Sequence, residues 1–512
     1  MTQQVLPAPP ASRPYVLTGF VVVAALAALA AFPPLQASGL GWFALVPLIL
    51  ALTQMPPRRA FWHGCLFGLI YMAGIMSFVG KYGFAPWLAL AGAMALLYGL
   101  FGVATSLLRT AWPLPRVFGI AAAWTLVEMA RGHAGSIAFT FGDLAYSQYL
   151  KLPLIQIAGF FGHYGVGFLM ALLGAGMATV GLVMLPSTWH RPGPLPLFNK
   201  HAGRVGVLCF LLVFANYFLG RYQLSLAQRG PKQQLQVKVA AIQALGAPPP
   251  LGEHYSTQEA LNAYLAESRK ATGADLIVWP ETAIVQPINL DKALLRQVQG
   301  LARSQKANLL IGTGEQEGDC VFNSAWYIRP DGRVGGTYHK MDLVFFGEYV
   351  PFRDKCKFFE RYPIRDFDYT AGLSRKVFDT GQYRFAPLIC FEGIFPSPCR
   401  EVAWMGADLI VILTSDEWAR NTNEVRQHSN MDVFRAIESR KYVVRAATNG
   451  RSAVFDPYGQ VLAQTGLYEN GSAVATITPR PELSPYHRWG DWPLLFYCLF
   501  ALCMGLLLRR RG

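Results

Sequence analysis

The chain has 512 residues, of which 53% are hydrophobic and only 15% are charged, and its formal net charge is +14. This composition excludes a disordered chain, collagen, a coiled coil and a disulfide-rich miniprotein, and a mean hydropathy of +0.27 argues against a purely soluble protein. The basic excess lies between apolar runs, which is typical of loops that orient a membrane protein and not of a nucleic-acid-binding surface. We therefore expect a polytopic membrane region joined to a soluble domain, with no nucleic-acid partner.

The apolar segments are concentrated before Tyr222, where two acidic residues, Glu128 and Asp143, stand against twelve lysines and arginines. A membrane-spanning helix needs roughly 17–25 mostly apolar residues. The expected spans are Val16–Phe32, Leu40–Thr53, Ala60–Gly80, Trp87–Leu108, Val117–Met129, Gly165–Leu185, Val205–Leu219 and Pro493–Leu508. Ile155–Tyr164 is expected to be an interfacial approach to the sixth span. Residues 1–222 thus form a membrane domain with about seven helices, and residues 492–512 an eighth helix with a basic tail.

The loop charges predict an orientation. With a cytoplasmic N-terminus, Arg58, Arg59 and the tail Arg509–Arg511 lie in the cytoplasm, whereas Lys81 and Lys151 lie on the opposite side with few other cations. Positive charge is enriched in cytoplasmic loops of membrane proteins. If the count of seven preceding spans is right, residues 223–491 lie outside the cytoplasm and both termini lie inside.

Residues 223–491 have the pattern of an α/β domain, because apolar strands alternate with amphipathic helices and are followed by antiparallel-looking pairs. About 270 residues can bury a core of their own. The expected strands are Val237–Ile242, Asp275–Trp279, Asn308–Gly312, Arg384–Cys390, Asp408–Thr414, Tyr442–Ala447, Ser452–Phe455 and Val474–Ile477. The expected helices are Thr257–Thr272, Asp291–Lys306 and Glu424–Ser439.

Three reactive residues follow strand-like stretches: Glu281, Lys340 and Cys390. Strand ends are where ligands bind in α/β folds. A cysteine thiol is mostly protonated at neutral pH, so a nearby carboxylate must take its proton, and an ammonium can stabilise the thiolate and an oxyanion. Each residue also has an ordinary alternative role: Cys390 as a buried strand cysteine, Glu281 as a cap or ion-pair partner, and Lys340 as a solvated loop lysine.

The sequences Trp279-Pro-Glu281, Tyr338-His-Lys340 and Ile389-Cys-Phe-Glu392 resemble those of the nitrilase, or carbon–nitrogen hydrolase, superfamily. Together with eight expected spans, with Trp124-x-x-x-Glu128-x-x-Arg131 and with Tyr146-Ser-Gln148, they resemble the apolipoprotein N-acyltransferase family. The resemblance implies an α-β-β-α sandwich in the extracytoplasmic domain. It also implies that Glu281 is the base, Lys340 the oxyanion partner and Cys390 the nucleophile. The supporting residues that it implies are Glu348, Glu392 and Phe391.

The resemblance further implies an activity: acyl transfer from a membrane phospholipid, through a cysteine thioester, to the N-terminal α-amine of a diacylglyceryl-cysteine apolipoprotein. Such an enzyme is expected in the bacterial inner membrane, with its catalytic domain on the periplasmic side, as a monomer and without a cofactor. The candidates for substrate binding are Trp418, Tyr146, Glu128 and Arg131. The last two can equally form a structural ion pair, and Trp418 can be a core or interface aromatic residue. The chain departs from the family pattern at Ile137–Phe141, which has neither Pro nor Trp, and at Phe391, where the family often has Tyr.

Two other function classes remain open. A membrane-anchored amidase or nitrilase would use water in place of the amine, although one span would suffice to anchor it. A transporter or sensor would carry a degenerate domain, whereas all three reactive residues are present. The sequence has no His-x-x-x-His or Cys-x-x-Cys, so no metal site is expected. A disulfide among Cys320, Cys356 and Cys399 is compatible with an oxidising compartment, but its pairing cannot be deduced from sequence.

Overall fold

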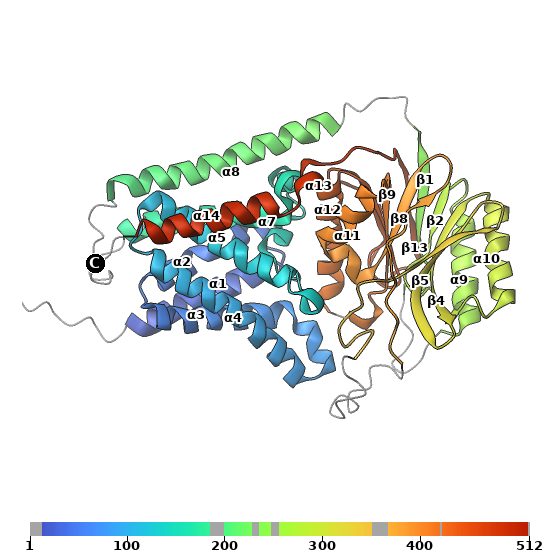
Figure 1. The fold of residues 1–512 in the computed structure, drawn as a ribbon, viewed down its shortest axis with the longest axis horizontal. Coiled ribbons are helices and arrows are strands. Elements are labelled where there is room, and N and C mark those ends of the chain that lie inside the picture. Colours follow the sequence, from blue (N-terminus) through green and yellow to red (C-terminus); the bar gives the residue numbers. More distant parts are fainter. Residues whose placement is uncertain are drawn as a thin grey trace, which may run out of the picture.

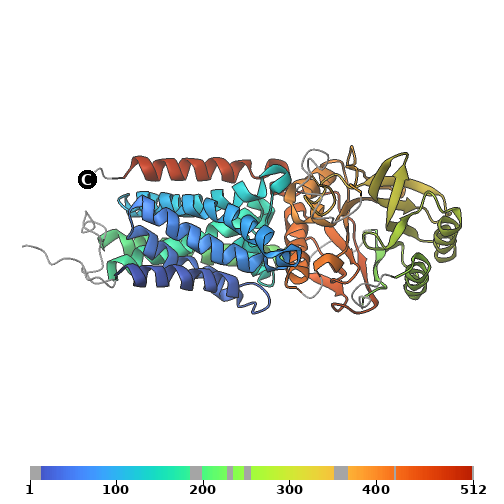
Figure 2. The same ribbon diagram turned by 90° about the horizontal axis from the view of Figure 1, so that it is seen from below.

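The computed structural model describes residues 13–184, 199–227, 235–246, 255–350, 367–419 and 422–509. A body of long helices lies at one end of the molecule and an α/β body lies at the other, in both views (Figures 1 and 2). Our expectations for Cys356, Arg510 and Arg511 lie outside the described residues. Cys320 and Cys399 are free thiols.

A helix coincides with each of the eight apolar segments expected from the sequence. The helical body consists of α1 (Arg13–Ala30), α2 (Leu45–Thr53), α3 (Pro57–Ile75), α4 (Phe84–Leu108), α5 (Pro113–Gly132), α6 (Leu152–Ile155), α7 (Ala158–Met184), α8 (Asn199–Ala227) and α14 (Trp492–Leu507). Within the described residues, three segments are long and apolar enough to cross a membrane, namely 84–108, 158–184 and 201–226, and three shorter apolar helices accompany them. The number of membrane crossings therefore stays a prediction.

Two expectations about this body are refined. α3 and α5 are not among the segments that are long and apolar enough to cross a membrane. They carry charged residues such as Arg59 in α3 and Glu128 in α5. The segment Ile155–Tyr164, expected to lie at the interface, contains the end of α6 and the first turns of α7. The backbone of α7 is kinked at Gly162, whose φ is +66°, and a side chain there would meet the ring of Tyr486 at 2.8 Å.

The α/β body contains two sheets. The first has the order β13-β1-β2-β4-β5-β6, with β3 paired to β4, and the second has the order β12-β11-β10-β9-β8-β7. The strands of the first sheet are β1 (Val237–Gln243), β2 (Leu276–Val278), β3 (Ile284–Pro287), β4 (Asn308–Glu317), β5 (Cys320–Ile328), β6 (Val334–His339) and β13 (Gly471–Ile477). Those of the second are β7 (Phe378–Asp379), β8 (Arg384–Ile389), β9 (Leu409–Thr414), β10 (Tyr442–Ala447), β11 (Ala453–Phe455) and β12 (Val461–Gln464). Every expected strand is confirmed, β6 is the strand-like stretch before Lys340, and β3, β5, β7 and β12 are additional.

The two sheets are enclosed by helices. A core of buried residues from both sheets fills the space between them, and a second core joins the first sheet to α9 (Thr257–Lys270) and α10 (Lys292–Gln305). On the other side, α11 (Pro396–Trp404) and α12 (Glu424–Ser439) cover the second sheet (Figure 1). The α-β-β-α sandwich is therefore confirmed.

Local signals fix where these helices begin. Ser256 caps α9: its hydroxyl oxygen accepts a hydrogen bond from the Glu259 amide at 3.2 Å, and the Glu259 carboxylate accepts one from the Ser256 amide at 2.9 Å. Asp291 caps α10 by accepting hydrogen bonds from two backbone amides, each at 2.9 Å. Both side chains satisfy backbone donors that have no partner inside the helix.

The second sheet's helical layer joins the two bodies. One continuous core of buried residues runs from the long helices onto α11 and α12. Polar contacts reinforce it: the His163 amide donates to Glu438 at 2.8 Å, and the Gln156 side chain donates to the Tyr458 carbonyl at 2.9 Å. The α/β body is thus packed against the helical body through the layer that covers β8 and β9.

Candidate active site

Strand ends from both sheets supply the three reactive residues. Glu281 follows β2 and Lys340 follows β6 in the first sheet, whereas Cys390 follows β8 in the second. The Lys340 ammonium lies 3.3 Å from the Glu281 carboxylate, and the charges of both groups act on the Cys390 thiol. The structure therefore brings together three residues that are far apart in sequence.

The turn that carries Glu281 needs a glycine beside it. Gly312 in β4 is so close that a side chain there would meet the Pro280 carbonyl oxygen at 2.1 Å and the Glu281 Cα at 2.7 Å. Only a residue without Cβ allows this approach without displacing the backbone. The Trp279 ring behind the turn is fully buried and donates to the Ser268 hydroxyl at 2.8 Å. The position of the carboxylate is therefore fixed by packing on both sides.

Lys340 is buried between two carboxylates. Its ammonium nitrogen lies 2.8 Å from Glu348 Oε2 and 3.3 Å from Glu281 Oε1, and the side chain is 1% exposed. Burial on its own would lower the pKa of Lys340, but the two carboxylates raise it well above its ordinary value. The lysine is therefore held as a cation in the site.

The sequence did not reveal Asn323, which links the two carboxylates. Its amide nitrogen donates to Glu281 at 2.7 Å and to Glu348 at 3.0 Å. The other oxygen of Glu281 accepts a hydrogen bond from the Ser415 backbone amide at 2.8 Å. Both oxygens of Glu281 therefore have protein donors, which orient the carboxylate without occupying all its lone pairs.

Cys390 is buried, with 5% exposure, and its φ of +52° lies in the left-handed region. Non-glycine residues rarely adopt this conformation, and such strain is concentrated at functional sites. Burial raises the pKa of the thiol well above its ordinary value and Glu281 adds to the effect, whereas Lys340 and a hydrogen bond with Thr414 lower it. The resting thiol is neutral, so nucleophilic attack requires a base, and Glu281 is the nearby carboxylate.

Glu392 connects the lysine loop to the cysteine strand. Its Oε2 accepts a hydrogen bond from the Ile389 amide at 2.7 Å, and its Oε1 accepts one from the Met341 amide at 2.8 Å. The Asp342 amide at 3.2 Å, the Tyr338 hydroxyl at 2.7 Å and the Arg375 guanidinium at 2.5 Å also donate to Oε1. Glu392 is fully buried and thus holds the residues next to Lys340 and Cys390 in register.

Two aromatic candidates lie toward the helical body. The Phe391 ring is 5.3 Å from that of Phe395 and packs on the core shared with the long helices. The Trp418 ring is 37% exposed and lies 5.6 Å from the Phe78 ring in an edge-to-face contact. Both residues therefore lie at the junction of the two bodies and on the side of the second sheet.

The candidates within the helical body have protein partners. The Arg131 guanidinium pairs with Asp143 at 2.5 Å, and one oxygen of Glu128 accepts a hydrogen bond from the Leu144 amide at 2.8 Å. Arg131 therefore pairs with Asp143 and not with Glu128. The Tyr146 hydroxyl accepts a hydrogen bond from Arg435 of α12 at 3.1 Å. These contacts anchor the segment after α5 and connect it to the α/β body.

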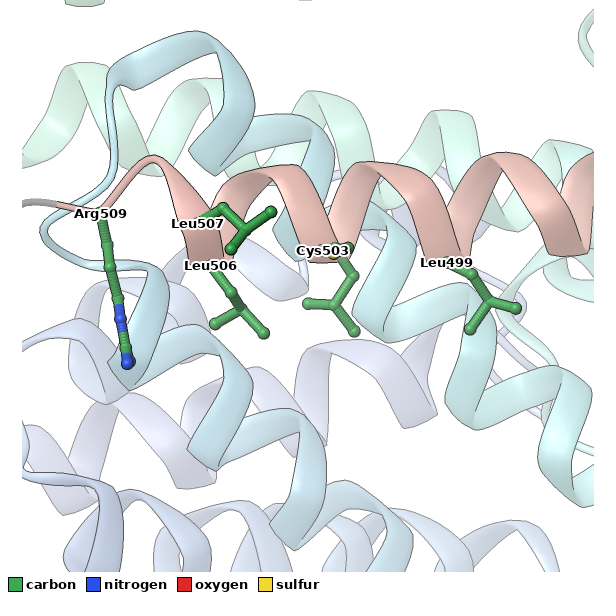
Figure 3. Close-up of a pocket in the computed structure, with 6 residues that line it drawn as sticks. Leu499, Cys503, Leu506, Leu507 and Arg509 are labelled. Atoms are coloured by element: carbon green, nitrogen blue, oxygen red, sulfur yellow. The ribbon is translucent and has the colours of Figure 1, made fainter.

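Two hollows lie on the described part of the structure. One, of about 450 Å³, lies directly after Lys340 and is lined by both bodies: Ser136, Met341, Leu343, Tyr349, Asp368, Tyr369 and Ala371. The other, of about 380 Å³, is an apolar hollow on α14, and its lining residues are Leu499, Leu502, Cys503, Leu506, Leu507 and Arg509 (Figure 3). It lies at the end of α14 that points away from the sheets (Figure 1). The first hollow is therefore the one whose lining includes the residue next to Lys340.

Comparisons with known proteins agree with both halves of the chain. The carbon–nitrogen hydrolase family matches residues 238–481, and the apolipoprotein N-acyltransferase N-terminal domain matches residues 24–176. An apolipoprotein N-acyltransferase of Geobacter metallireducens is 32% identical over 477 residues, which cover 90% of this chain and 89% of the relative. Another, from Pseudomonas putida, is 30% identical over 96% of both chains. A solved structure of a Nesterenkonia amidase from the nitrilase superfamily covers 52% of this chain and 97% of its own, with 20% identity and a TM-score of 0.40. From the match over nearly its whole length, the chain belongs to the apolipoprotein N-acyltransferase family.

Proposed function

We propose that this protein N-acylates lipoproteins, moving an acyl chain from a membrane phospholipid to the N-terminal amine of a diacylglyceryl-cysteine apolipoprotein. The observation that carries the proposal is the buried Glu281–Lys340 pair beside a strained, neutral Cys390. The names of the relatives, apolipoprotein N-acyltransferases, support the acceptor.

In the first step, Glu281 accepts the Cys390 proton and the sulfur attacks the ester carbon of a phospholipid. The carbonyl oxygen becomes an oxyanion, which the Lys340 ammonium stabilises. When the oxyanion collapses, the C–O bond to the glycerol oxygen breaks, and Glu281 returns its proton to that oxygen. The products are a lysophospholipid and an acyl-cysteine thioester.

In the second step, the α-amine of the acceptor attacks the thioester carbon. Glu281 takes a proton from the nitrogen as the C–N bond forms, and the C–S bond then breaks. The departing sulfur regains a proton and Cys390 is ready for another cycle. A thioester suits this exchange because it retains the reactivity of the acyl group while the first product leaves.

The supporting residues have distinct roles in this proposal. Glu348 holds the Lys340 ammonium at 2.8 Å, so that Glu281 does not have to neutralise the lysine alone. Glu392 positions the residues next to Lys340 and Cys390 through the backbone amides it binds. Phe391 and Trp418 lie where an acyl chain would arrive from the helical body, and Tyr146, Glu128 and Arg131 shape that body beneath them.

The helical body allows both lipid substrates to remain in the bilayer while they react. A soluble enzyme would have to extract each acyl chain at a cost of about 0.8 kcal/mol per CH₂. We propose a membrane domain at residues 1–222, a periplasmic catalytic domain at 223–491 and a C-terminal span at 492–512. The eight spans lie in the bacterial inner membrane with both termini in the cytoplasm, and the enzyme acts as a monomer without a cofactor.

The experiment follows the label. The full-length protein in detergent micelles is mixed with a phospholipid that carries an acyl-chain label, and its intact mass is measured before and after addition of a diacylglyceryl-cysteine peptide. We expect one acyl adduct on Cys390, which the peptide then removes as an N-acylated product. Release of free fatty acid without the peptide, at the same rate as with it, would indicate a membrane-anchored hydrolase. Absence of any adduct would refute the covalent route.

A further inference from the structure

A second cluster of ionisable residues lies behind the active site, where β9 leads into α12. Asp416 follows β9, and Glu424 and His428 lie in the first turns of α12. All three are buried, and one ligand-type atom of each lies within 4.8 Å of the others. The proposed acyl transfer uses none of these side chains.

The spacing suits a metal ion. Glu424 and His428 are four residues apart on a helix and therefore share one face. His428 Nδ1 lies 2.9 Å from Asp416 Oδ1 and 3.5 Å from Glu424 Oε1. Ligand atoms in a tetrahedral zinc site with bonds of about 2.0–2.1 Å are about 3.3 Å apart. The two distances lie on either side of that value.

Glu424 is the residue that points to a missing partner. Its side chain is fully buried, and neither carboxylate oxygen has a hydrogen-bond partner among the residues that the structure describes. A buried carboxylate that receives no hydrogen bond is costly.

The surrounding charges do not balance that carboxylate. Arg445 donates to Asp416 at 2.9 Å and to Asp432 at 3.0 Å, so one cation is shared by two acids. When Asp416, Asp432 and Glu424 are all ionised and His428 is neutral, these three acids face Arg445 and, from the helical body, Lys81, whose charge also acts on Glu424, so the group keeps an excess of negative charge. A bound metal cation would offset this excess.

We propose that Asp416, Glu424 and His428 bind one divalent metal ion of the zinc class. Two carboxylate oxygens and one imidazole nitrogen form a mixed ligand set, which favours zinc over magnesium, since magnesium prefers oxygen ligands and water. Arg445 and Thr414 contact the same Asp416 carboxylate, as outer partners commonly do around metal ligands. The expectation of no metal from sequence rested on short ligand motifs, whereas here the fold brings Asp416 to the helix.

The ion would stiffen the active site from behind. Asp416 is adjacent to Ser415, whose backbone amide donates to Glu281 at 2.8 Å. Fixing Asp416 therefore fixes one of the donors that orient the catalytic carboxylate. The site is distinct from the acyl-transfer machinery, so its presence or absence is decided separately from the proposed function.

The test uses Zn²⁺ alone as the probe, and all variants are made in one common background protein. A second cluster, Glu315, Glu317 and His339, has the same ligand types but includes the exposed Glu317. All measurements are therefore made in full-length protein carrying His339→Gln, which removes that imidazole. Two proteins are compared: the His339→Gln background and the same background with Glu424→Gln. Each is stripped with a chelator and dialysed against micromolar Zn²⁺, and its metal content and melting temperature are then measured.

We expect about one Zn²⁺ per chain in the background protein and a melting temperature that rises with Zn²⁺. With Glu424→Gln, both the bound ion and the rise should be lost, while the melting temperature in chelator stays equal or increases because an uncompensated carboxyl is gone. His428→Gln provides the same comparison if the first variant does not fold. Equal zinc content in the background protein and the variants, or no zinc in either, would overturn the proposal and leave Glu424 as a protonated buried acid.

Discussion

The Lys340 ammonium lies 2.8 Å from Glu348, closer than the 3.3 Å that separates it from Glu281. The lysine charge is therefore shared unequally between the two carboxylates. A base that gave all its charge to an ion pair would have little tendency to take a proton, because an adjacent cation lowers the pKa of a carboxylate. By taking the stronger contact, Glu348 leaves Glu281 available for the proposed role of base.

Glu348→Gln should make the protein less stable near neutral pH. Burial opposes ionisation of Glu348, but Lys340 and several hydrogen bonds lower its pKa below the ordinary value. Its ionised form therefore stabilises the fold above the unfolded pKa of about 4.3, and this contribution is lost as pH falls through the lower folded value. The melting-temperature difference between wild type and variant should thus be large at pH 7 and shrink only as pH falls below about 4. A difference that is independent of pH would contradict the ion pair.

Cys390→Ala should abolish acyl adduct formation while the protein still folds, because alanine fills the same strand end with only a sulfur removed. Cys390→Ser should retain little activity, since a hydroxyl is much harder to deprotonate than a thiol. Intact-mass measurement after incubation with phospholipid checks both variants, and melting temperatures serve as the folding control. Near-normal transfer to the peptide by the alanine variant would eliminate the covalent mechanism.

Glu392→Gln should lower both stability and acylation rate. The amide would turn an NH₂ group toward backbone donors such as the Met341 and Ile389 amides, and it would leave Arg375 without its buried counter-charge. Breaking a buried ion pair typically costs about 3–5 kcal/mol. Thermal unfolding and single-turnover acylation are measured together. A loss of rate with unchanged melting temperature would mean that Glu392 acts on the substrate and not through the backbone.

The exposed, free thiol of Cys320 offers a direct test of topology. If the catalytic domain is periplasmic, a membrane-impermeant maleimide should label Cys320 in spheroplasts, and Cys320→Ser should remove the label. In that serine background, a cysteine replacing the exposed Arg59 should react only after the membrane is permeabilised. Labelling at position 59 in intact spheroplasts would reverse the proposed orientation.

The reactive trio could be predicted from sequence because each member follows a strongly apolar strand or a distinctive short motif. Asn323 could not, since β5 mixes polar and apolar residues and was not recognised as a strand. Its partners, Glu281 and Glu348, lie on either side of it in the chain at separations of 42 and 25 residues. Only the pairing of β5 with β4 and β6 shows that its side chain lies between them.

In the helical body, too, the sequence predicted the positions of the elements but not the partners of their polar residues. The positions of all eight helices followed from apolar runs, because burial in lipid and burial in protein both require apolar surface. Hydropathy alone could not show how the polar residues of α5 are accommodated. Arg131 is neutralised by Asp143, and Glu128 accepts a backbone hydrogen bond from Leu144. Those partners come from the irregular segment after α5, whose path a local pattern does not reveal.

Glu281→Gln and Lys340→Met should both slow acylation of Cys390, but they should respond differently to pH. Glutamine keeps the size of Glu281 yet cannot accept the thiol proton. It also removes a negative charge that raises the pKa of Cys390, while Lys340 continues to lower it. The thiol of this variant should therefore ionise directly as pH rises, and its acylation rate should partly recover.

Lys340→Met removes the cation that stabilises both the thiolate and the oxyanion. In this variant, burial and Glu281 still raise the pKa of Cys390, but the lysine charge that lowers it is gone. A given increase in pH therefore produces less thiolate than in the glutamine variant. The tetrahedral intermediate also loses one stabilising group, which typically costs about 2.7–4 kcal/mol, or a factor of about 10²–10³ in rate. The single-turnover rate of adduct formation is measured between pH 6 and roughly pH 10. The upper limit is set near the ordinary pKa of lysine, and melting temperatures serve as the folding control. Equal recovery of the two variants would refute this division of roles, and a wild-type rate for Lys340→Met would make Lys340 a structural partner of Glu348 alone.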